Sequence, residues 1–413
     1  MAEGTARPLT TDGDRLWRSL MDMAEIGATT AGGSNRLALT DADKAGRDLF
    51  VRWCRDVGCS VEVDAIGNIF ARREGVRPGA APVLIGSHLD TQATGGRFDG
   101  VYGVLAALEV IRTLNDAGVH TEFPIEAVAW TNEEGARFAP AMMGSAVWSG
   151  AQALADAHAR TDRSGCRVDE ELRRIGYLGD RHCVPGPVRA AFEVHIEQGP
   201  VLERAGRQIG VVTGIQGVRW FEIGVDGTSC HAGTTPMDAR RDPIRALSEF
   251  LPELHRLVDR HQPLARLTVG RLAAIPGAYN TVPKRATVGV DLRHPDAAVL
   301  DDLAAALESS VLAACERHGL SGSVRVELDC APVSFAPECV DAVQRAADAC
   351  GYHAMRMVSG AAHDSMHVAR VAPTGMIFVP CEDGVSHNEA ERARPEDLEA
   401  GCNVLLGAVL ELR

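Results

Sequence analysis

An alternation of short apolar runs and helical segments between residues 82 and 130 is the strongest constraint on the fold of this 413-residue chain. The run Pro82–Gly86 is bounded by proline and glycine and fits a buried strand. A helical pattern over Tyr102–Ala117 ends at Gly118, and a second buried strand is expected over Ile125–Trp130. This β-α-β order predicts an α/β sheet with helices on its faces.

The pattern changes near residue 214 and changes back after residue 335. Between these points the order is strand, helix, strand, strand, helix, strand, which is the ferredoxin-like split βαβ pattern. A strand over Thr374–Val379 and a closing helix from about Pro395 then resume the first pattern. The sequence therefore predicts an α/β domain, residues 1–213 and 331–413, interrupted by a smaller α+β domain at 214–330. Further helices are expected at 9–30 and 40–57, and further strands at 60–64, 68–72 and 191–194.

Composition excludes several classes of partner. The formal net charge of −14 repels phosphate backbones and anionic membranes, and 5 % aromatic residues leave few platforms for stacking bases. No apolar stretch reaches the ~18 residues of a membrane span, and the first residues carry no secretory apolar core. The 11 cysteines form no CxxC pair. We therefore expect a cytoplasmic protein with reduced thiols that binds neither nucleic acid nor membranes.

Histidine and carboxylate residues follow the predicted strands. His88, in the segment Gly86-Ser-His-Leu-Asp90, lies at the carboxyl end of a buried strand, where ligands gather in open α/β sheets. Its ring could bind a metal ion while Asp90, two residues on, orients the ring from behind. The alternative is a capped turn with a histidine whose hydrogen bonds are satisfied locally.

Three carboxylates lie close to this position in the predicted sheet. Asp99, in Gly95-Gly-Arg-Phe-Asp-Gly100, could cap the following helix or bridge two cations ~3.5–4 Å apart. Glu133 and Glu134 end the next strand, where adjacent glutamates are usually solvated. At this edge, one of them could instead bind metal while the other acts as a general base on water.

His195, in His195-Ile-Glu-Gln-Gly199, and His387, in Ser386-His-Asn388, add two histidines at the same edge. Three histidines and three carboxylates without a thiolate suit Zn²⁺ or Mn²⁺ better than a structural zinc cage. The sequence therefore predicts a metal site at the ends of consecutive strands.

These segments resemble the M20 family of dinuclear metallohydrolases from about residue 15 to the end. They are most similar to its ureido-acid branch: N-carbamoyl-L-amino acid hydrolases, β-ureidopropionases and allantoate amidohydrolases. The histidine at position 195, where many M20 peptidases have a carboxylate, indicates this branch. The resemblance implies a mixed sheet flanked by helices, interrupted by a ferredoxin-like dimerisation (lid) domain. It also implies two divalent metal ions per subunit, Zn²⁺ or Mn²⁺, with Co²⁺ or Ni²⁺ as other options.

The resemblance also implies a role for each residue of the centre. One ion is held by His88, Asp99 and His195, and the other by Asp99, Glu134 and His387. Glu133 is then the general base, while Asp90 and Asp364 support the centre without binding the ions.

The inserted domain supplies the remaining roles that the resemblance implies. His231, in Gly227-Thr-Ser-Cys-His-Ala-Gly-Thr-Thr-Pro236, reaches the active site of the partner subunit of a homodimer and stabilises the oxyanion. Gln216, Asn280 and Arg293 bind substrate, and Arg293 offers a planar fork to a carboxylate. The loop with Gly360 presents backbone N–H groups to the same carboxylate. Without the resemblance, His231 and Arg293 would be read as a loop histidine and a solvated arginine.

The implied activity is hydrolysis of the carbamoyl C–N bond of ureido acids, either N-carbamoyl-L-amino acids or N-carbamoyl-β-alanine. The products are the amino acid, CO₂ and ammonia. Allantoate amidohydrolase is the first alternative. An aminoacylase or dipeptidase, and a non-catalytic binding protein with an M20-like fold, are the others. All five metal ligands and the base are present, which disfavours the binding protein.

Overall fold

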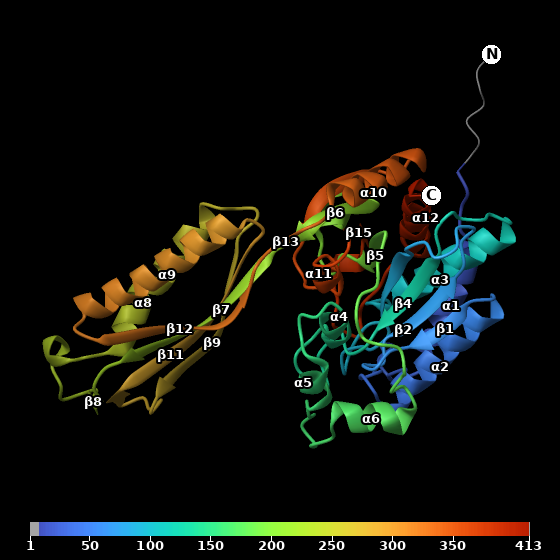
Figure 1. Ribbon diagram of the computed structural model, residues 1–413. Coiled ribbons are helices and arrows are strands. Elements are labelled where there is room, and N and C mark those ends of the chain that lie inside the picture. The colour runs from blue at the N-terminus through green and yellow to red at the C-terminus, as the bar shows by residue number, and fades with distance from the viewer. Residues whose placement is uncertain (1–7, 413) are drawn as a thin grey trace, which may run out of the picture. The chain divides into compact units, whose positions relative to one another are not determined.

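The computed structural model describes residues 8–412, and these divide into two compact units. The residues up to Gly214 and from Ser334 onward form the large unit, and Ile215–Val333 form the inserted unit. Figure 1 shows the elements of each unit. No helix within residues 8–412 is both long and apolar enough to cross a membrane.

A mixed sheet forms the centre of the large unit, in the strand order β1-β2-β4-β3-β5-β15-β6-β13, with β14 paired to β6. Its strands are β1 (Ser60–Val63), β2 (Ile69–Arg73), β3 (Val83–His88), β4 (Ile125–Trp130), β5 (Ala190–Ile196), β6 (Ile209–Ile215), β13 (Val333–Ser334), β14 (Ala354–Ser359) and β15 (Thr374–Val379). The neighbours β4, β3, β5 and β15 run parallel, whereas β1, β2 and β6 pair antiparallel. The carboxyl ends of four adjacent strands therefore meet at one edge.

Helices cover both faces of these central strands, and every residue of β3, β4, β5 and β15 is buried. On one face, α3 (Val101–Asp116) and α12 (Pro395–Glu411) pack on the sheet, with α1 (Gly13–Ala24) and α10 (Pro337–Ala349) against them. On the other face, Trp148 of α4 (Met143–Trp148) and Val368 of α11 (Ser365–Val368) pack with Leu84 and Val128. Near-continuous apolar strands are the expected result of burial on both faces.

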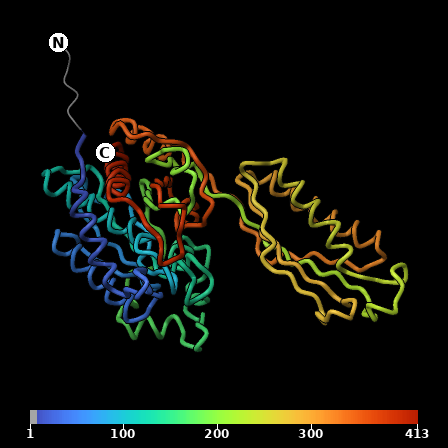
Figure 2. The backbone as a smooth tube through the Cα atoms, turned by 180° about the vertical axis from the view of Figure 1, so that it is seen from behind, coloured from blue at the N-terminus to red at the C-terminus, as the bar shows by residue number. Residues whose placement is uncertain are grey.

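The first and last helices of the chain lie side by side in the large unit, as Figure 2 shows in blue and red. A hydrogen bond joins the segment before α1 to α12, because the Thr11 backbone N–H donates to Asn403 Oδ1 at 2.7 Å. The Tyr102 hydroxyl also donates to the Leu398 carbonyl at 2.7 Å and ties α3 to α12. The segments before and after the inserted unit thus form one compact unit.

Some predicted boundaries are wrong. The helix expected at 9–30 is limited to α1 because the Asp12 side chain caps its start by accepting the Arg15 N–H, and Gly27 has a φ of +82°. The helix after Asp99 begins at Val101 without a side-chain cap, so Asp99 does not cap it. Several short elements were not predicted: α5 (Leu154–His158), α6 (Val168–Ile175), α7 (Val201–Ala205), β6 and β14. The second helix is α2 (Asp41–Asp56), close to its expected range.

The inserted unit has a four-stranded antiparallel sheet in the order β12-β7-β11-β9. Its chain order is β7 (Gly217–Asp226), α8 (Pro243–Asp259), β9 (Arg266–Ile275), β11 (Arg285–His294), α9 (Ala297–Arg317) and β12 (Ser321–Cys330), with a small β8–β10 pair (Cys230–His231, Thr281–Val282). Residues of β11 alternate strictly between buried and half-buried, so one face packs against the helices. Phe250 of α8 and Leu307 of α9 fill that core.

Candidate metal centre

The carboxyl edge of the parallel strands gathers the histidines and carboxylates of the large unit. His88 is the last residue of β3, and His195 is the penultimate residue of β5. Glu133 and Glu134 follow β4, and His387 lies in the segment after β15. The position of each side chain therefore follows from the end of a buried strand or from the loop after it.

Asp99 lies at the centre of this group and contacts all three histidines. Its Oδ1 atom lies 3.1 Å from His195 Nε2 and 3.8 Å from His88 Nε2. Its Oδ2 atom lies 3.3 Å from His387 Nε2, which is in turn 3.4 Å from Glu134 Oε2. Two groups that could hold a metal ion result, His88–Asp99–His195 and Asp99–Glu134–His387, and they share Asp99.

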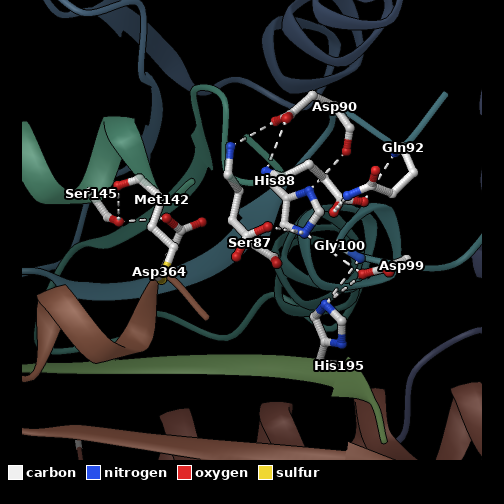
Figure 3. A network of polar contacts seen from close by, with 12 residues as sticks. Ser87, His88, Asp90, Gln92, Asp99, Gly100, Met142, Ser145, His195 and Asp364 are labelled. Atoms are coloured by element: carbon white, nitrogen blue, oxygen red, sulfur yellow. Dashed lines mark hydrogen bonds and ion pairs between the residues drawn. The ribbon is translucent and has the colours of Figure 1, made fainter. Parts of the chain in front are cut away.

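Backbone carbonyls orient two of the histidine rings, and Figure 3 shows one of them, His88 beside Asp90. His88 Nδ1 lies 2.9 Å from the Asp90 carbonyl, and His195 Nδ1 lies 2.8 Å from the Ile196 carbonyl. Because a carbonyl only accepts hydrogen bonds, each Nδ1 carries a proton, which leaves Nε2 to face Asp99. This is the tautomer that a histidine needs to bind a metal ion through Nε2.

Gly100 makes the close approach of the loop to these rings possible. Its φ is +67°, and a Cβ atom there would lie 2.2 Å from His88 Cε1. Its N–H points to His195 Nε2 at 3.1 Å. A side chain at position 100 would therefore push the Asp99 loop away from the histidines.

Burial and neighbouring charges shift the pKa values of the carboxylates and histidines in this group. Burial, together with the Asp364 and Glu134 carboxylates, raises the pKa of Glu133 well above its usual range. Burial and the Asp99 carboxylate raise the pKa of Glu134 to about 8. Burial, the largest single effect, lowers the pKa of His195, but the hydrogen bond to Asp99 and the charges of Asp99 and Glu193 together raise that pKa to about 9.

Raised pKa values of glutamates and histidines are expected where the negative charge of several carboxylates is buried together away from water. A divalent cation would neutralise that charge and take the place of protons on the histidines. The donors are imidazole nitrogens and carboxylate oxygens, which Zn²⁺ and Mn²⁺ accept. The residues present therefore fit a metal centre.

Asp90 supports the centre differently from the expectation. The contact to the His88 ring comes from the backbone carbonyl of Asp90, not from its carboxylate. The carboxylate instead accepts the N–H groups of Glu133 and Glu134, each at 3.2 Å. Gln92 holds Glu134 as well, because its side-chain amide donates to Glu134 Oε2 at 2.7 Å.

Sequence reasoning missed three residues around Asp99. The Gln198 side-chain amide donates to Asp99 Oδ2 at 2.8 Å, and the Ser386 hydroxyl lies 3.0 Å from the same atom. Glu391 accepts the Asp99 N–H at 3.2 Å. Gln198 and Ser386 stand inside the motifs of His195 and His387, so their polar side chains were a usable signal. Glu391 gave none, because only the folded loops bring it to Asp99.

A third group that could hold an ion, Glu193–His195–His363, was not predicted. It shares His195 with the first group. Both oxygens of Glu193 already accept hydrogen bonds, from the Ser87 hydroxyl at 2.7 Å and from the Ser365 hydroxyl at 2.6 Å. A charged residue inside the apolar strand β5 was the signal that could have identified it.

The Asp364 carboxylate accepts the Ser145 hydroxyl at 2.5 Å and is fully buried near Glu133. The preceding loop, which contains Gly360, belongs to the large unit.

Two other loops at this sheet edge contain non-glycine residues with a left-handed backbone, because Asn132 and His387 have φ values of 55° and 53°. Such non-glycine residues persist only where neighbouring contacts hold them.

The remaining predicted site residues belong to the inserted unit. His231 is exposed in β8, and its Nδ1 atom accepts the Gly233 and Thr234 N–H groups at 3.0 and 3.2 Å. Its Nε2 atom therefore carries the proton in the neutral ring. Asn280 lies on the adjacent segment, because its carbonyl accepts the Ala232 N–H at 2.9 Å. Arg293 pairs with Asp291 at 2.8 Å, and Gln216 is buried at the start of the unit.

An α/β sheet edge at which three histidines, a shared aspartate and paired glutamates meet is typical of a metal-dependent hydrolase. Residues 84–411 match peptidase family M20/M25/M40, and the chain belongs to this family. The resemblance inferred from the motifs and the predicted α/β class are both confirmed. The family is metal-dependent and acts on small molecules.

Similar proteins cover almost the whole chain. An N-carbamoyl-L-amino-acid amidohydrolase of Rhizobium meliloti is 48 % identical and covers 96 % of each chain. One of Geobacillus stearothermophilus is 40 % identical over 97 % of this chain and 98 % of its own. The crystal structure of an amidase of the hydantoinase/carbamoylase family from Burkholderia multivorans superposes with a TM-score of 0.95, at 53 % identity and 98 % coverage of both chains.

Proposed function

We propose that this chain hydrolyses the carbamoyl C–N bond of N-carbamoyl-L-amino acids to the amino acid, CO₂ and ammonia. The observation that carries the proposal is Asp99, which contacts His88, His195 and His387 at one sheet edge with Glu133 and Glu134 beside it. The relatives with that name are similar over nearly the whole length of the chain, so the same site is expected in them.

Two divalent cations, Zn²⁺ or Mn²⁺, are proposed for the centre, with Co²⁺ or Ni²⁺ as other options. His88, Asp99 and His195 would hold one, and Asp99, Glu134 and His387 the other. When bound, such a pair lowers the pKa of water and stabilises negative charge that develops on a carbonyl oxygen.

Glu133 is the proposed general base. Its Oε2 atom lies 3.5 Å from His88 Nε2, and its backbone is fixed by Asp90. It takes a proton from the attacking water as the water oxygen bonds to the carbamoyl carbon. It then gives the proton to the amino-acid nitrogen as the C–N bond breaks. The other product, carbamic acid, decomposes to CO₂ and ammonia.

The inserted unit is proposed to supply substrate contacts. His231 is the proposed hydrogen-bond donor to the oxyanion, because Nε2 carries the proton of its neutral ring. Arg293 binds the substrate carboxylate through its planar guanidinium, and Asn280 and Gln216 add amide contacts. In the large unit, the loop with Gly360 offers backbone N–H groups to the same carboxylate.

A homodimer through the inserted unit is proposed, in which His231 serves the partner's site. Strand β9 is an edge strand, and its end exposes Leu272 and Ile275. Pairing of an apolar edge strand with its own copy would cover unpaired backbone groups. The cytoplasm is the proposed compartment, because the 11 cysteines form no CxxC pair and suit reduced thiols.

The test is ammonia release by the full-length enzyme, loaded with Mn²⁺ or Zn²⁺. The panel contains N-carbamoyl-α-amino acids of both hands, N-carbamoyl-β-alanine, allantoate and N-acetyl-amino acids, with amino-acid release measured for the last. We expect the highest kcat/KM for N-carbamoyl-L-α-amino acids. A preference for allantoate or for N-acetyl-amino acids would assign one of the alternative activities, and turnover of none would indicate a binding protein.

A further inference from the structure

Glu391 is a buried carboxylate outside the proposed ligand set that connects the two loops of the centre. It is 0 % exposed. Its Oε1 atom accepts the Phe98 N–H at 2.9 Å and the Asp99 N–H at 3.2 Å. Its Oε2 atom lies 2.9 Å from the Ser386 hydroxyl, which is also 3.0 Å from Asp99 Oδ2. One carboxylate thus bonds the backbone of the Asp99 loop and the residue next to His387.

Gly96, in the Asp99 loop, leaves the space that this carboxylate occupies. A Cβ atom at Gly96 would lie 2.0 Å from Glu391 Oε1. Gly96 has no positive φ, so it is the space, not the backbone conformation, that requires glycine here. The Glu391 carboxylate also lies close to the like-charged Asp99 in a buried place, which is unfavourable unless hydrogen-bond donors compensate. The three donors are the backbone N–H groups of Phe98 and Asp99 and the hydroxyl group of Ser386.

Irregular loops carry both Asp99 and His387, and neither residue is held by a regular strand or helix. His387 has a left-handed backbone and a half-exposed side chain. Its position relative to Asp99 therefore depends on contacts between the two loops. Ser386 makes such a contact at Asp99 Oδ2, the oxygen that faces His387, and Glu391 joins Ser386 to the backbone N–H of Asp99.

We propose that Glu391 is a positioning residue that fixes Asp99 relative to His387 and thereby sets the affinity of the cation held by Asp99, Glu134 and His387. This inference rests on the metal centre of the proposed function. Partners that orient metal ligands typically contribute ~10–100-fold to metal affinity. The effect falls on one ion, because Ser386, which Glu391 holds, contacts Asp99 Oδ2, the oxygen that faces His387.

The experiment is a stepwise calorimetric titration of the metal-free, full-length protein with Mn²⁺ and, separately, Zn²⁺. The wild type should bind two ions. Glu391→Ala should keep one ion at wild-type affinity and bind the other roughly 10- to 100-fold more weakly. Glu391→Gln should recover most of that loss, because its amide oxygen still accepts the two N–H groups and its NH₂ can donate to Ser386. The control Glu396→Ala removes an exposed carboxylate of α12 and should leave both affinities unchanged.

Gly96→Ala tests the same idea without removing a charge or a hydrogen-bonding group. The added Cβ displaces the Glu391 carboxylate, so the same ion should bind more weakly. Gly186→Ala is the matched control, since nothing lies within 4 Å of a Cβ there. If Glu391→Ala fails to fold by circular dichroism, Glu391→Gln and Gly96→Ala decide the result.

The outcomes separate this inference from the proposed function. A wild type that binds no ion removes the metal centre itself. A wild type that binds two ions, with variants at positions 391 and 96 that bind both equally well, overturns the role of Glu391 alone. Equal weakening of both ions in Glu391→Ala, without recovery in Glu391→Gln, would indicate general loosening of the fold and also overturn it.

Discussion

The large and inserted units place their polar residues in opposite ways. In the large unit, four parallel strands end at one edge, and His88, Asp99 and His195 are buried there. In the inserted unit, all strand pairs of the four-stranded sheet are antiparallel, helices cover one face, and His231 and Asn280 are exposed. Trp220, on the face of β7 opposite Phe221, is 47 % exposed.

The difference follows from strand direction. Parallel strands bring the same ends of several segments together, so residues from distant parts of the sequence converge in a low-dielectric place. Antiparallel strands distribute their ends over both edges, so fewer segments end together, and His231 and Asn280 stay exposed. The large unit therefore holds a candidate set of metal ligands of its own, whereas the inserted unit forms no comparable group among the described residues.

Removal of metal should have the largest effect and should act only through the large unit. A chelator should abolish activity, and Mn²⁺, Co²⁺, Ni²⁺ or Zn²⁺ should restore part of it, because three histidines and two carboxylates lose their cations. Activity is measured by ammonia release before and after chelation. Full activity in a sample shown to be metal-free would contradict the proposed centre.

Glu133→Gln should keep both metal ions and lower kcat by about 10²–10⁴-fold, since a general base contributes that much. Glu134→Gln should instead weaken the binding of one ion, because Glu134 belongs to a ligand group. Metal content by elemental analysis, together with kcat, distinguishes the two adjacent residues. Near-normal turnover of Glu133→Gln would show that another group is the base.

His231→Ala should lower kcat by about 10²–10³-fold, the effect of losing one oxyanion donor, while metal content stays intact. His255→Ala, an exposed histidine of the same unit, serves as the control. Mixing His231→Ala with Glu133→Gln chains should restore activity if His231 acts across a dimer. Subunit exchange without restored activity would show that each unit serves its own chain.

Arg293→Ala should raise KM roughly 10- to 100-fold with a smaller change in kcat, because a charge-assisted hydrogen bond to the substrate carboxylate contributes ~1.5–3 kcal/mol. Arg285→Ala, on the same strand β11 and paired with Asp226, should leave KM unchanged. Steady-state kinetics with an N-carbamoyl-L-amino acid measures both. An unchanged KM for Arg293→Ala would remove it from substrate binding.

Leu307→Ala should affect the metal centre least. Leu307 is 1 % exposed in the core of the inserted unit, so its truncation should destabilise that unit by about 2–5 kcal/mol. Leu312→Ala on the same helix, where the side chain is 44 % exposed, should cost much less. Denaturant unfolding gives the stability, and calorimetry should show two ions bound in each variant. Lost metal binding in Leu307→Ala would show that the two units depend on one another.

The local pattern was sufficient for most central elements. Strands such as Val83–His88 and Ile125–Trp130 are short, fully apolar and bounded by turn residues, so the sequence marks them directly. The order of elements in the inserted unit was equally readable because β11 alternates strictly. Short helices such as α4 and α11 escaped prediction because they are stabilised by packing on the sheet rather than by their own pattern.

Residue type, and position at a strand end or in the loop after it, were enough to propose His88, Glu133, Glu134, His195 and His387 from the sequence, because parallel strands bring such ends together. Tertiary structure alone decided which atoms meet. The Asp90 carbonyl rather than its carboxylate orients His88, and Glu391 reaches Asp99 across 292 residues of chain. Such contacts depend on how loops fold over one another, and no local periodicity encodes loop geometry. The sequence thus determined the chemistry that the sheet edge can hold, and loop packing decided how firmly each ligand is held.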